Sequence, residues 1–145
     1  SRAETNGRDA SMVLVDTNVL LDVVEDDPKW ANWSQWQLDA IGLKEQLCID
    51  PVIYSELSIA FDRIEELNRA LAAASINVLP TIPREALFLA GKAFLTYRKR
   101  GGAARTGVLP DFFIGAHAAV AEMPILTRDD RRYRSYFPTV QLITP

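Results

Sequence analysis

The sequence has very few thiol and imidazole side chains: its 145 residues include one cysteine, Cys48, and one histidine, His117. A single cysteine cannot form a disulfide within the chain, and in its apolar run we expect it to be a small buried hydrophobe. Zinc sites are built from several cysteine and histidine ligands, so this composition excludes a zinc site. We expect a reducing, cytoplasmic setting.

Long apolar runs and an excess of positive charge are absent too. No run approaches the roughly 18 residues that span a bilayer, and residues 1–11 are polar where a signal peptide would be apolar. We therefore expect no membrane partner. The formal net charge of −3 argues against binding nucleic acid by bulk positive charge, but it leaves room for a local basic patch.

The length fits one folded unit. A chain of 145 residues with 48% hydrophobic side chains can bury one full core but hardly two. Residues 1–11 show no hydrophobic periodicity, so we interpret them as a disordered tail or a leftover of cloning. The domain is predicted to cover residues 12–145.

Short apolar runs alternate with segments of helical spacing. The predicted strands lie at 13–15, 47–49, 76–79, 125–126 and 141–143. The predicted helices lie at 19–25, 30–43, 53–74, 84–100 and 111–122. Strands that are apolar on both faces and separated by helices predict an α/β fold, a three-layer α/β/α sandwich with a mainly parallel five-stranded sheet. Ligands of such sheets bind beyond the carboxyl ends of the strands.

The fourth predicted helix carries an apolar stripe that we interpret as packing rather than as a site. Its members are Ala86, Leu87, Ala90, Ala93, Phe94 and Tyr97.

Two acidic residues follow predicted strands. Asp16 comes directly after the first strand, and Asp129 comes shortly after the fourth. Because parallel strands end at the same edge of a sheet, both carboxylates are expected at that edge. The spacing after Thr127 favours Asp129 over its neighbour Asp130, which either assists or faces solvent.

Two further acids lie on predicted helices. Asp111 lies in the first turn of its helix, where the helix dipole favours the charged form. Glu56 lies on a half-buried helical face after the second strand, where an acid needs a partner. His117 lies roughly 240° around the helix from Asp111, so we interpret it as structural rather than as a co-ligand.

Each acid alone would be interpreted as a helix cap. However, four acids are expected at strand ends and helix starts of the same sheet edge. No Lys or Arg stands beside Asp16, Glu56 or Asp111 in the sequence to neutralise them. A cation is therefore expected to supply the missing charge, and oxygen-only ligation fits Mg²⁺ or Mn²⁺. We interpret the other acids considered as a helix cap, Asp50, and as solvated helix or turn residues, Asp22, Asp26, Asp27 and Asp39.

Four sequence motifs together resemble a known family. They are Val-Asp-Thr-Asn-Val-Leu-Leu from residue 15, Ile-Tyr-Ser-Glu-Leu from 53, Pro-Asp-Phe-Phe-Ile-Gly-Ala-His-Ala from 110, and Leu-Thr-Arg-Asp-Asp-Arg-Arg-Tyr from 126. In this order they resemble a PIN-domain ribonuclease of the VapC toxin type, from a type II toxin-antitoxin system. The resemblance implies an RNA substrate, a VapB-like antitoxin and a homodimer. It also implies an acidic metal-binding set, Asp16, Glu56, Asp111 and Asp129, with Asn18 and Thr127 as polar supports.

The chemistry that these residues predict is phosphodiester hydrolysis. One or two metal ions would activate a water for in-line attack and stabilise the leaving 3′-oxygen. One alternative is a phosphoacceptor signalling domain, which needs a Lys at a late strand end. The four lysines, Lys29, Lys44, Lys92 and Lys99, do not follow strands. Another alternative is a catalytically silent PIN-like interaction domain, which would be expected to lack one of the four acids.

A basic segment precedes the helix of Asp111. Two interpretations stay open for it: a solvated loop, or a contact to the phosphate backbone of RNA. Its members are Arg98, Lys99, Arg100 and Arg105.

Overall fold

A computed structural model describes residues 11–101 and 108–145. The predicted tail, apart from its last residue, lies outside these described residues, and so does Arg105. Within them the chain forms five strands, each within one residue of its predicted bounds at either end. They are β1 (Met12–Val15), β2 (Gln46–Ile49), β3 (Ile76–Val78), β4 (Ile125–Leu126) and β5 (Leu142–Ile143).

The strands form one sheet in the order β3-β2-β1-β4-β5, and every pairing is parallel. The central strands are buried on both faces: Leu14, Val15 and Leu126 have no exposed surface. This explains why they are continuous apolar runs rather than alternating ones. The chain moves outward from β1 to β3 and then returns to place β4 on the other side of β1. Ligand sites of open parallel sheets lie at such a reversal.

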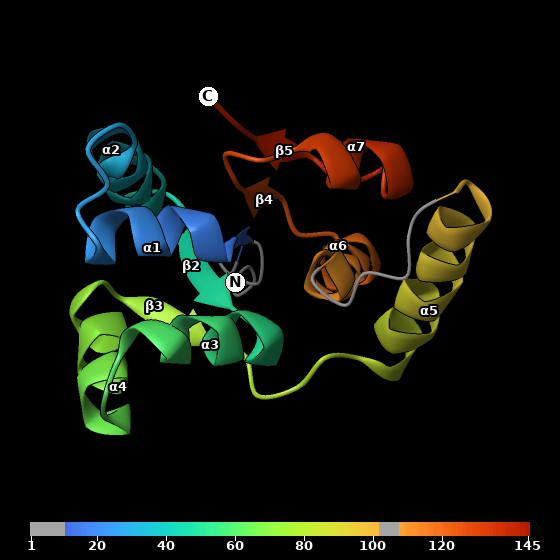
Figure 1. Ribbon diagram of the computed structural model, residues 1–145. Helices are drawn as coiled ribbons and strands as arrows, with labels where there is room; N and C mark the ends of the chain where they lie inside the picture. Colours follow the sequence, from blue (N-terminus) through green and yellow to red (C-terminus); the bar gives the residue numbers. More distant parts are fainter. Residues whose placement is uncertain (1–10, 102–107) are drawn as a thin grey trace, which may run out of the picture.

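Helices cover both faces of the sheet. Figure 1 shows α1, α2 and α4 to the left of the strands and α5, α6 and α7 to their right, which confirms the predicted three-layer sandwich. Helix α3 contacts both α1 and α6. None of the helices in the described ranges is long and apolar enough to cross a membrane. Their bounds are α1 (Thr17–Val24), α2 (Ala31–Gly42), α3 (Pro51–Leu57), the 3₁₀ turn η2 (Ser58–Ala60), α4 (Ile64–Ala73), α5 (Arg84–Lys99), α6 (Leu109–Ala121) and α7 (Arg131–Tyr136).

The prediction of one continuous helix over 53–74 is wrong. The backbone is extended at Phe61 and again at Arg63, so α3 and η2 end before α4 begins. The break lets Phe61 pack against the core, while Leu67 and Leu71 of α4 are buried separately. Helical periodicity in the sequence continues across the break, which is why the sequence did not reveal it.

Helix α5 packs on α6 through small residues. Ala86, Ala90 and Ala93 are buried, whereas Leu87 is 44% exposed, so its place in the predicted apolar stripe is wrong. Leu87 lies about 100° around the helix from Ala86 and so points away from the contact with α6.

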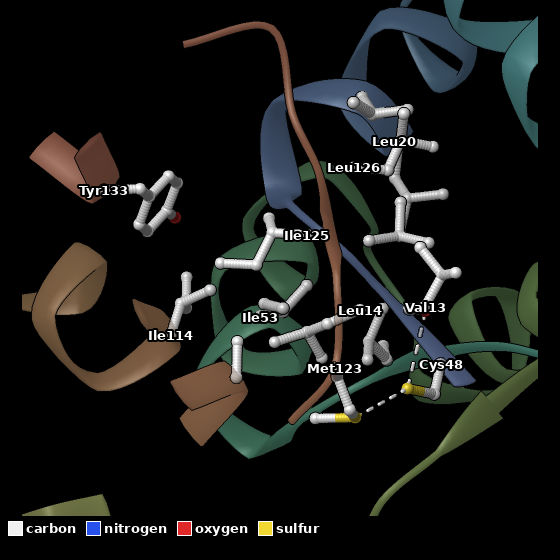
Figure 2. Close-up of a cluster of buried hydrophobic side chains, with 14 of the residues drawn as sticks. Val13, Leu14, Leu20, Cys48, Ile53, Ile114, Met123, Ile125, Leu126 and Tyr133 are labelled. Carbon is white, nitrogen blue, oxygen red and sulfur yellow. Dashed lines mark hydrogen bonds between the residues drawn. The ribbon is translucent and has the colours of Figure 1, made fainter. Parts of the chain in front are cut away.

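The apolar core lies on both faces of β1 and β4. Figure 2 shows Tyr133 at the edge of this core, with its hydroxyl directed away from α7. Cys48 is buried as predicted, and its sulfur lies 3.5 Å from the carbonyl oxygen of Val13 and 3.8 Å from the sulfur of Met123. The thiol fills space in the core and has no free surface.

Asp50 and His117 form a buried pair. One carboxylate oxygen of Asp50 accepts the backbone N–H of Ile53 at 3.0 Å and thereby caps α3, as predicted. The other oxygen lies 3.0 Å from Nδ1 of His117. Both side chains are buried. His117 therefore has a structural role in linking α6 to the start of α3.

We predict that Gly115→Ala destabilises the protein. A Cβ at this position of α6 would lie 2.3 Å and 2.5 Å from ring carbons of Phe137. Overpacking of this kind costs about 1–3 kcal/mol, which exceeds the gain of about 1 kcal/mol from helix propensity. We expect the free energy of unfolding in urea to fall by about 1 kcal/mol.

The matched control is Gly91→Ala on α5, where an added Cβ meets no atom within 4 Å. This variant should be as stable as the parent or more stable. Equal effects at the two glycines would contradict the close contact between Gly115 and Phe137.

Candidate functional site

The four predicted acids line one pocket of about 230 Å³, together with Thr17, Asn18 and Leu21. Four separate segments position them at the carboxyl edge of the sheet. Asp16 follows β1 and caps α1, Glu56 lies on α3, Asp111 lies in the first turn of α6, and Asp129 follows β4.

Asp16 is the buried centre of this pocket. Its Oδ2 accepts the hydroxyls of Tyr133 at 2.8 Å and Thr127 at 2.9 Å, and its Oδ1 accepts the backbone N–H of Thr17 at 2.8 Å. Burial raises the pKa of the Asp16 carboxyl to about 6, even though these three donors act to lower it. The negative charge of Glu56 raises that pKa further. The carboxylate is therefore held in one orientation at a site where a lone negative charge is unfavourable.

Asp111 lines the same pocket as Asp16 and is partly exposed. Burial, followed by the charge of Asp16, raises the pKa of the Asp111 carboxyl to about 7. Arg132 partly offsets these effects, because its Nε lies 3.9 Å from Oδ2 of Asp111. No basic residue stands beside Asp111 in the sequence, but the fold brings Arg132 close to it. Arg132 is distant in the sequence and reaches Asp111 only because α7 packs against α6.

The other two acids lie at the rim. Glu56 accepts a hydrogen bond from the hydroxyl of Thr17. Asp129 is exposed, and hydrogen bonds from Arg131 lower the pKa of its carboxyl. Asp130 does not line the pocket but pairs with Arg134 one turn along α7. Among the two neighbouring acids, the pocket therefore contains Asp129.

The two predicted polar supports join the start of α1 to the loop after β4. The Asn18 amide donates to the hydroxyl oxygen of Thr127 at 3.1 Å, and its carbonyl oxygen accepts the backbone N–H of Arg128 at 3.2 Å. The Thr127 hydroxyl oxygen also accepts the backbone N–H of Asp129 at 3.1 Å. These bonds fix the distance between the segments that carry Asp16 and Asp129.

The expectation that Asp22 is solvated is wrong. Asp22 is buried, where it accepts two hydrogen bonds from the guanidinium of Arg128, both at 2.8 Å, and one from the Ser34 hydroxyl at 2.7 Å. The Arg128 guanidinium in turn lies over the ring of Trp30, 5.5 Å from its centroid. Arg128 is far from Asp22 in the sequence, so nothing local indicated the pair.

The sequence also gave no role to Tyr133, although this residue ends the fourth motif. Its side chain is 1% exposed, and burial raises the pKa of its hydroxyl well above the usual range. The hydroxyl therefore stays protonated and serves as a permanent donor to Asp16. Its position in a motif rich in acids and arginines was the available signal, but its partner lies at the other end of the chain.

The donor set fits a Mg²⁺ or Mn²⁺ ion that keeps several water ligands better than an ion that is bound by protein ligands alone. Among the described residues, no three acidic, histidine or cysteine side chains converge closely enough to bind one ion together. Mg²⁺ keeps several waters and is typically held by one or two carboxylates. Burial and the neighbouring carboxylates raise the pKa values of Asp16 and Asp111, and a divalent ion bound in this pocket would favour the charged forms of both acids.

We predict that Tyr133→Phe weakens metal binding. The change removes one donor to Asp16 and keeps the ring, so the carboxylate is less well oriented and holds its proton more tightly. Loss of such a supporting hydrogen bond typically weakens metal affinity about 10- to 100-fold. We expect a tenfold or greater rise in the Kd for Mn²⁺, measured by isothermal titration calorimetry.

Tyr54→Phe is the matched control, because the Tyr54 hydroxyl donates to Asn68 at 2.7 Å on the exposed surface away from the pocket. Mn²⁺ affinity should not change in this variant. The same affinity in Tyr133→Phe and in the parent would show that the hydrogen bond to Asp16 does not prepare the site for a cation.

These features define a class of small α/β domain, in which a parallel sheet carries an acidic pocket at its carboxyl edge. Residues 13–137 match the PIN domain family, and the chain belongs to this family. The predicted resemblance to PIN domains is thereby confirmed. A comparison with curated protein sequences finds no match.

Solved structures of the same fold come from toxin-antitoxin complexes. The chain resembles one in VapBC2 from Rickettsia felis bound to a promoter DNA fragment, with a TM-score of 0.69, 14% identity and coverage of 92% of this chain and 98% of that one. For VapBC-1 from nontypeable Haemophilus influenzae the TM-score is 0.65 and the identity 19%, with coverage of 92% of this chain and 97% of that one. For DNA-bound VapBC from Salmonella typhimurium the TM-score is 0.65 and the identity 16%, with coverage of 93% of this chain and 98% of that one.

Proposed function

We propose that this protein is a Mg²⁺- or Mn²⁺-dependent endoribonuclease and the VapC-type toxin of a toxin-antitoxin pair. The observation that carries the proposal is the pocket that is lined by four carboxylates from four separate segments. Membership of the PIN domain family supports nuclease activity. The similarity in fold to chains of several VapBC complexes supports the toxin assignment.

In the proposed mechanism Asp16 and Asp111 are the main metal ligands, with Glu56 and Asp129 completing the acidic set. When bound, the ion supplies an activated water and stabilises charge on the phosphate and the leaving oxygen. Tyr133 and Thr127 orient the Asp16 carboxylate. Their hydrogen bonds are already made in the folded protein, so the site needs little reorganisation to bind the ion.

The proposed partners are an RNA substrate, a VapB-like antitoxin and a second copy of the chain. An apolar pocket of about 330 Å³ between α1, α2 and α4, lined by Leu20, Leu38 and Leu71 among others, offers a surface for an antitoxin segment. Exposed Phe88 and Leu95 on α5 are available for a homodimer. The buried lone cysteine supports a cytoplasmic location.

The alternatives have less support. A phosphoacceptor domain would use a lysine near its acids, and no lysine is among the described residues that line the carboxylate pocket. A silent interaction domain would not need the hydrogen bonds that hold Asp16 in place. We therefore favour the nuclease.

The test is cleavage of cellular RNA by the purified protein, with Mg²⁺ and with excess chelator, followed by sequencing of the new 5′ ends. We expect discrete, metal-dependent ends that are absent with Asp16→Asn. The asparagine keeps the acceptor for Thr17 and so preserves the start of α1. Absence of metal-dependent cleavage by the parent protein would overturn the proposal.

A further inference from the structure

A second pocket, of about 270 Å³, adjoins the carboxylate pocket. It is lined by Tyr97 of α5 and by Arg131, Arg132, Ser135 and Tyr136 of α7. Its lining is basic and aromatic, the opposite of the acidic pocket. Helix α7 thus supplies a hydrogen-bond donor, Tyr133, to Asp16 of the carboxylate pocket and two arginines to the lining of the second pocket.

The two arginines connect the pockets, because each lines the second pocket and approaches an acid of the first. Arg131 donates to Asp129 at 3.2 Å, and Nε of Arg132 lies 3.9 Å from Asp111. Both acids line the carboxylate pocket. An anion bound by these arginines in the second pocket would therefore lie close to the proposed metal ligands.

Aromatic rings hold two guanidinium groups in place. Arg132 lies over the ring of Tyr97 at 5.5 Å, and Arg100 lies over the ring of Tyr136 at 5.2 Å from the centroid. Both tyrosine rings pack on the fully buried ring of Phe112, with centroids 5.4 Å and 5.3 Å apart. Guanidinium groups fixed in this way lose less freedom when they bind an anion.

Arg132 is incompletely satisfied. Its side chain is 24% exposed, and its Nε is buried without a hydrogen-bond acceptor among the described residues. Its ion-pair partner among the described residues is Asp111, which is also a proposed metal ligand. A divalent cation at Asp111 would take up the charge of that carboxylate and leave the guanidinium available to an anion.

We propose that this second pocket binds a backbone phosphate of the RNA strand, next to the phosphodiester that the acidic pocket hydrolyses. This inference rests on the proposed function. Arg131 and Arg132 are the contacting residues, and the ring of Tyr97 supports the guanidinium of Arg132. Planar guanidinium forks match phosphate oxygens, and basic grooves with aromatic side chains are typical of single-strand binding. Of the predicted basic segment, Arg100 joins this site through Tyr136.

The experiment measures binding of a fluorescein-labelled single-stranded RNA by anisotropy over a range of salt concentrations. All variants carry Asp16→Asn and are measured in Mg²⁺, so that the RNA stays intact. We expect Arg132→Gln and Arg131→Gln each to weaken binding about tenfold. The slope of log affinity against log salt should fall by about 0.7 for each lost phosphate contact.

Two further variants make the test specific. Arg134→Gln removes an arginine of the same helix that pairs with Asp130 and does not line the pocket, so affinity and slope should stay at the parent values. Arg132→Lys keeps the charge but not the fork, so it should retain the slope while losing part of the affinity. Melting temperatures confirm that each variant is folded.

The outcomes separate this inference from the proposed function. If Arg131→Gln and Arg132→Gln bind RNA as Arg134→Gln does, the phosphate site is overturned and the nuclease proposal stands. If the variants weaken binding as expected but the protein without Asp16→Asn cleaves no RNA, the phosphate site stands and the nuclease proposal falls. If Arg132→Gln weakens binding of polyglutamate of equal charge but leaves RNA binding at the parent value, the pocket belongs to an acidic protein segment and the inference is overturned.

Discussion

Asp111→Asn should slow single-turnover cleavage of RNA at least about a hundredfold, because asparagine offers a neutral oxygen where a divalent cation needs an anion. The ion is then held less tightly, and the water that it activates is less well placed. The loss should exceed that of Tyr133→Phe, because Asp111 is a proposed direct ligand and Tyr133 acts through Asp16.

The same substitution should leave the metal-free fold intact. The pKa of Asp111 is raised to about 7, so its ionised form is disfavoured in the folded protein, and Asn removes one of several mutually repelling charges. We expect a metal-free melting temperature equal to that of the parent or slightly higher. Both measurements use one preparation, and exposed Asp62→Asn is the control for charge loss outside the pocket. Cleavage at the parent rate would reduce Asp111 to a first-turn acid of α6.

Added Mg²⁺ should stabilise the protein strongly at about pH 8 and much less at about pH 5. The pKa values of Asp16 and Asp111 rise from 3.8 in the unfolded chain to about 6 and about 7 in the folded one. The folded protein therefore binds more protons than the unfolded chain between these values. The contribution of these two groups to metal-free stability is highest below the unfolded pKa and is lost as pH rises through the folded pKa values.

A bound cation replaces the protons on Asp16 and Asp111. Its stabilising effect on the folded protein therefore grows as the pH rises and these protons dissociate. At a concentration about 100 times its Kd, a ligand adds about 2.7 kcal/mol to the free energy of unfolding. We expect an effect of this size at the higher pH, measured by urea denaturation with Mg²⁺ and with chelator. In Asp16→Asn the stabilisation by Mg²⁺ should shrink. Equal stabilisation by Mg²⁺ at both pH values would show that Mg²⁺ does not compete with protons at these acids.

The parallel sheet could be predicted because its determinants are local. Runs such as 13–15 and 125–126 are apolar on both faces and bounded by turn-forming or polar residues, so their burial in a parallel sheet follows from the residues themselves. Acids that follow such strands must lie near one edge of the sheet, so the sequence predicted that Asp16 and Asp129 lie close together. The two helical acids, Glu56 and Asp111, join them in the same pocket.

The remaining features depend on contacts between distant segments. Asp22 has no basic neighbour in its own helix, and its partner Arg128 reaches it from the loop after β4. Arg132 approaches Asp111, and Tyr133 approaches Asp16, only after α7 has packed. The break at Phe61 similarly depends on the core that the ring enters. Hydrophobic periodicity carries no information on these pairings.

The parallel pairing of β1 with β4 also has a consequence for biosynthesis. Asp16 is synthesised 111 residues before Thr127 and 117 residues before Tyr133, which are its two hydroxyl donors. A nascent chain, or a product cut after α6, therefore contains Asp16, Glu56 and Asp111 without the segment that completes their pocket. The acidic pocket is therefore complete only in molecules in which residues 127–133 have been synthesised and have packed against β1.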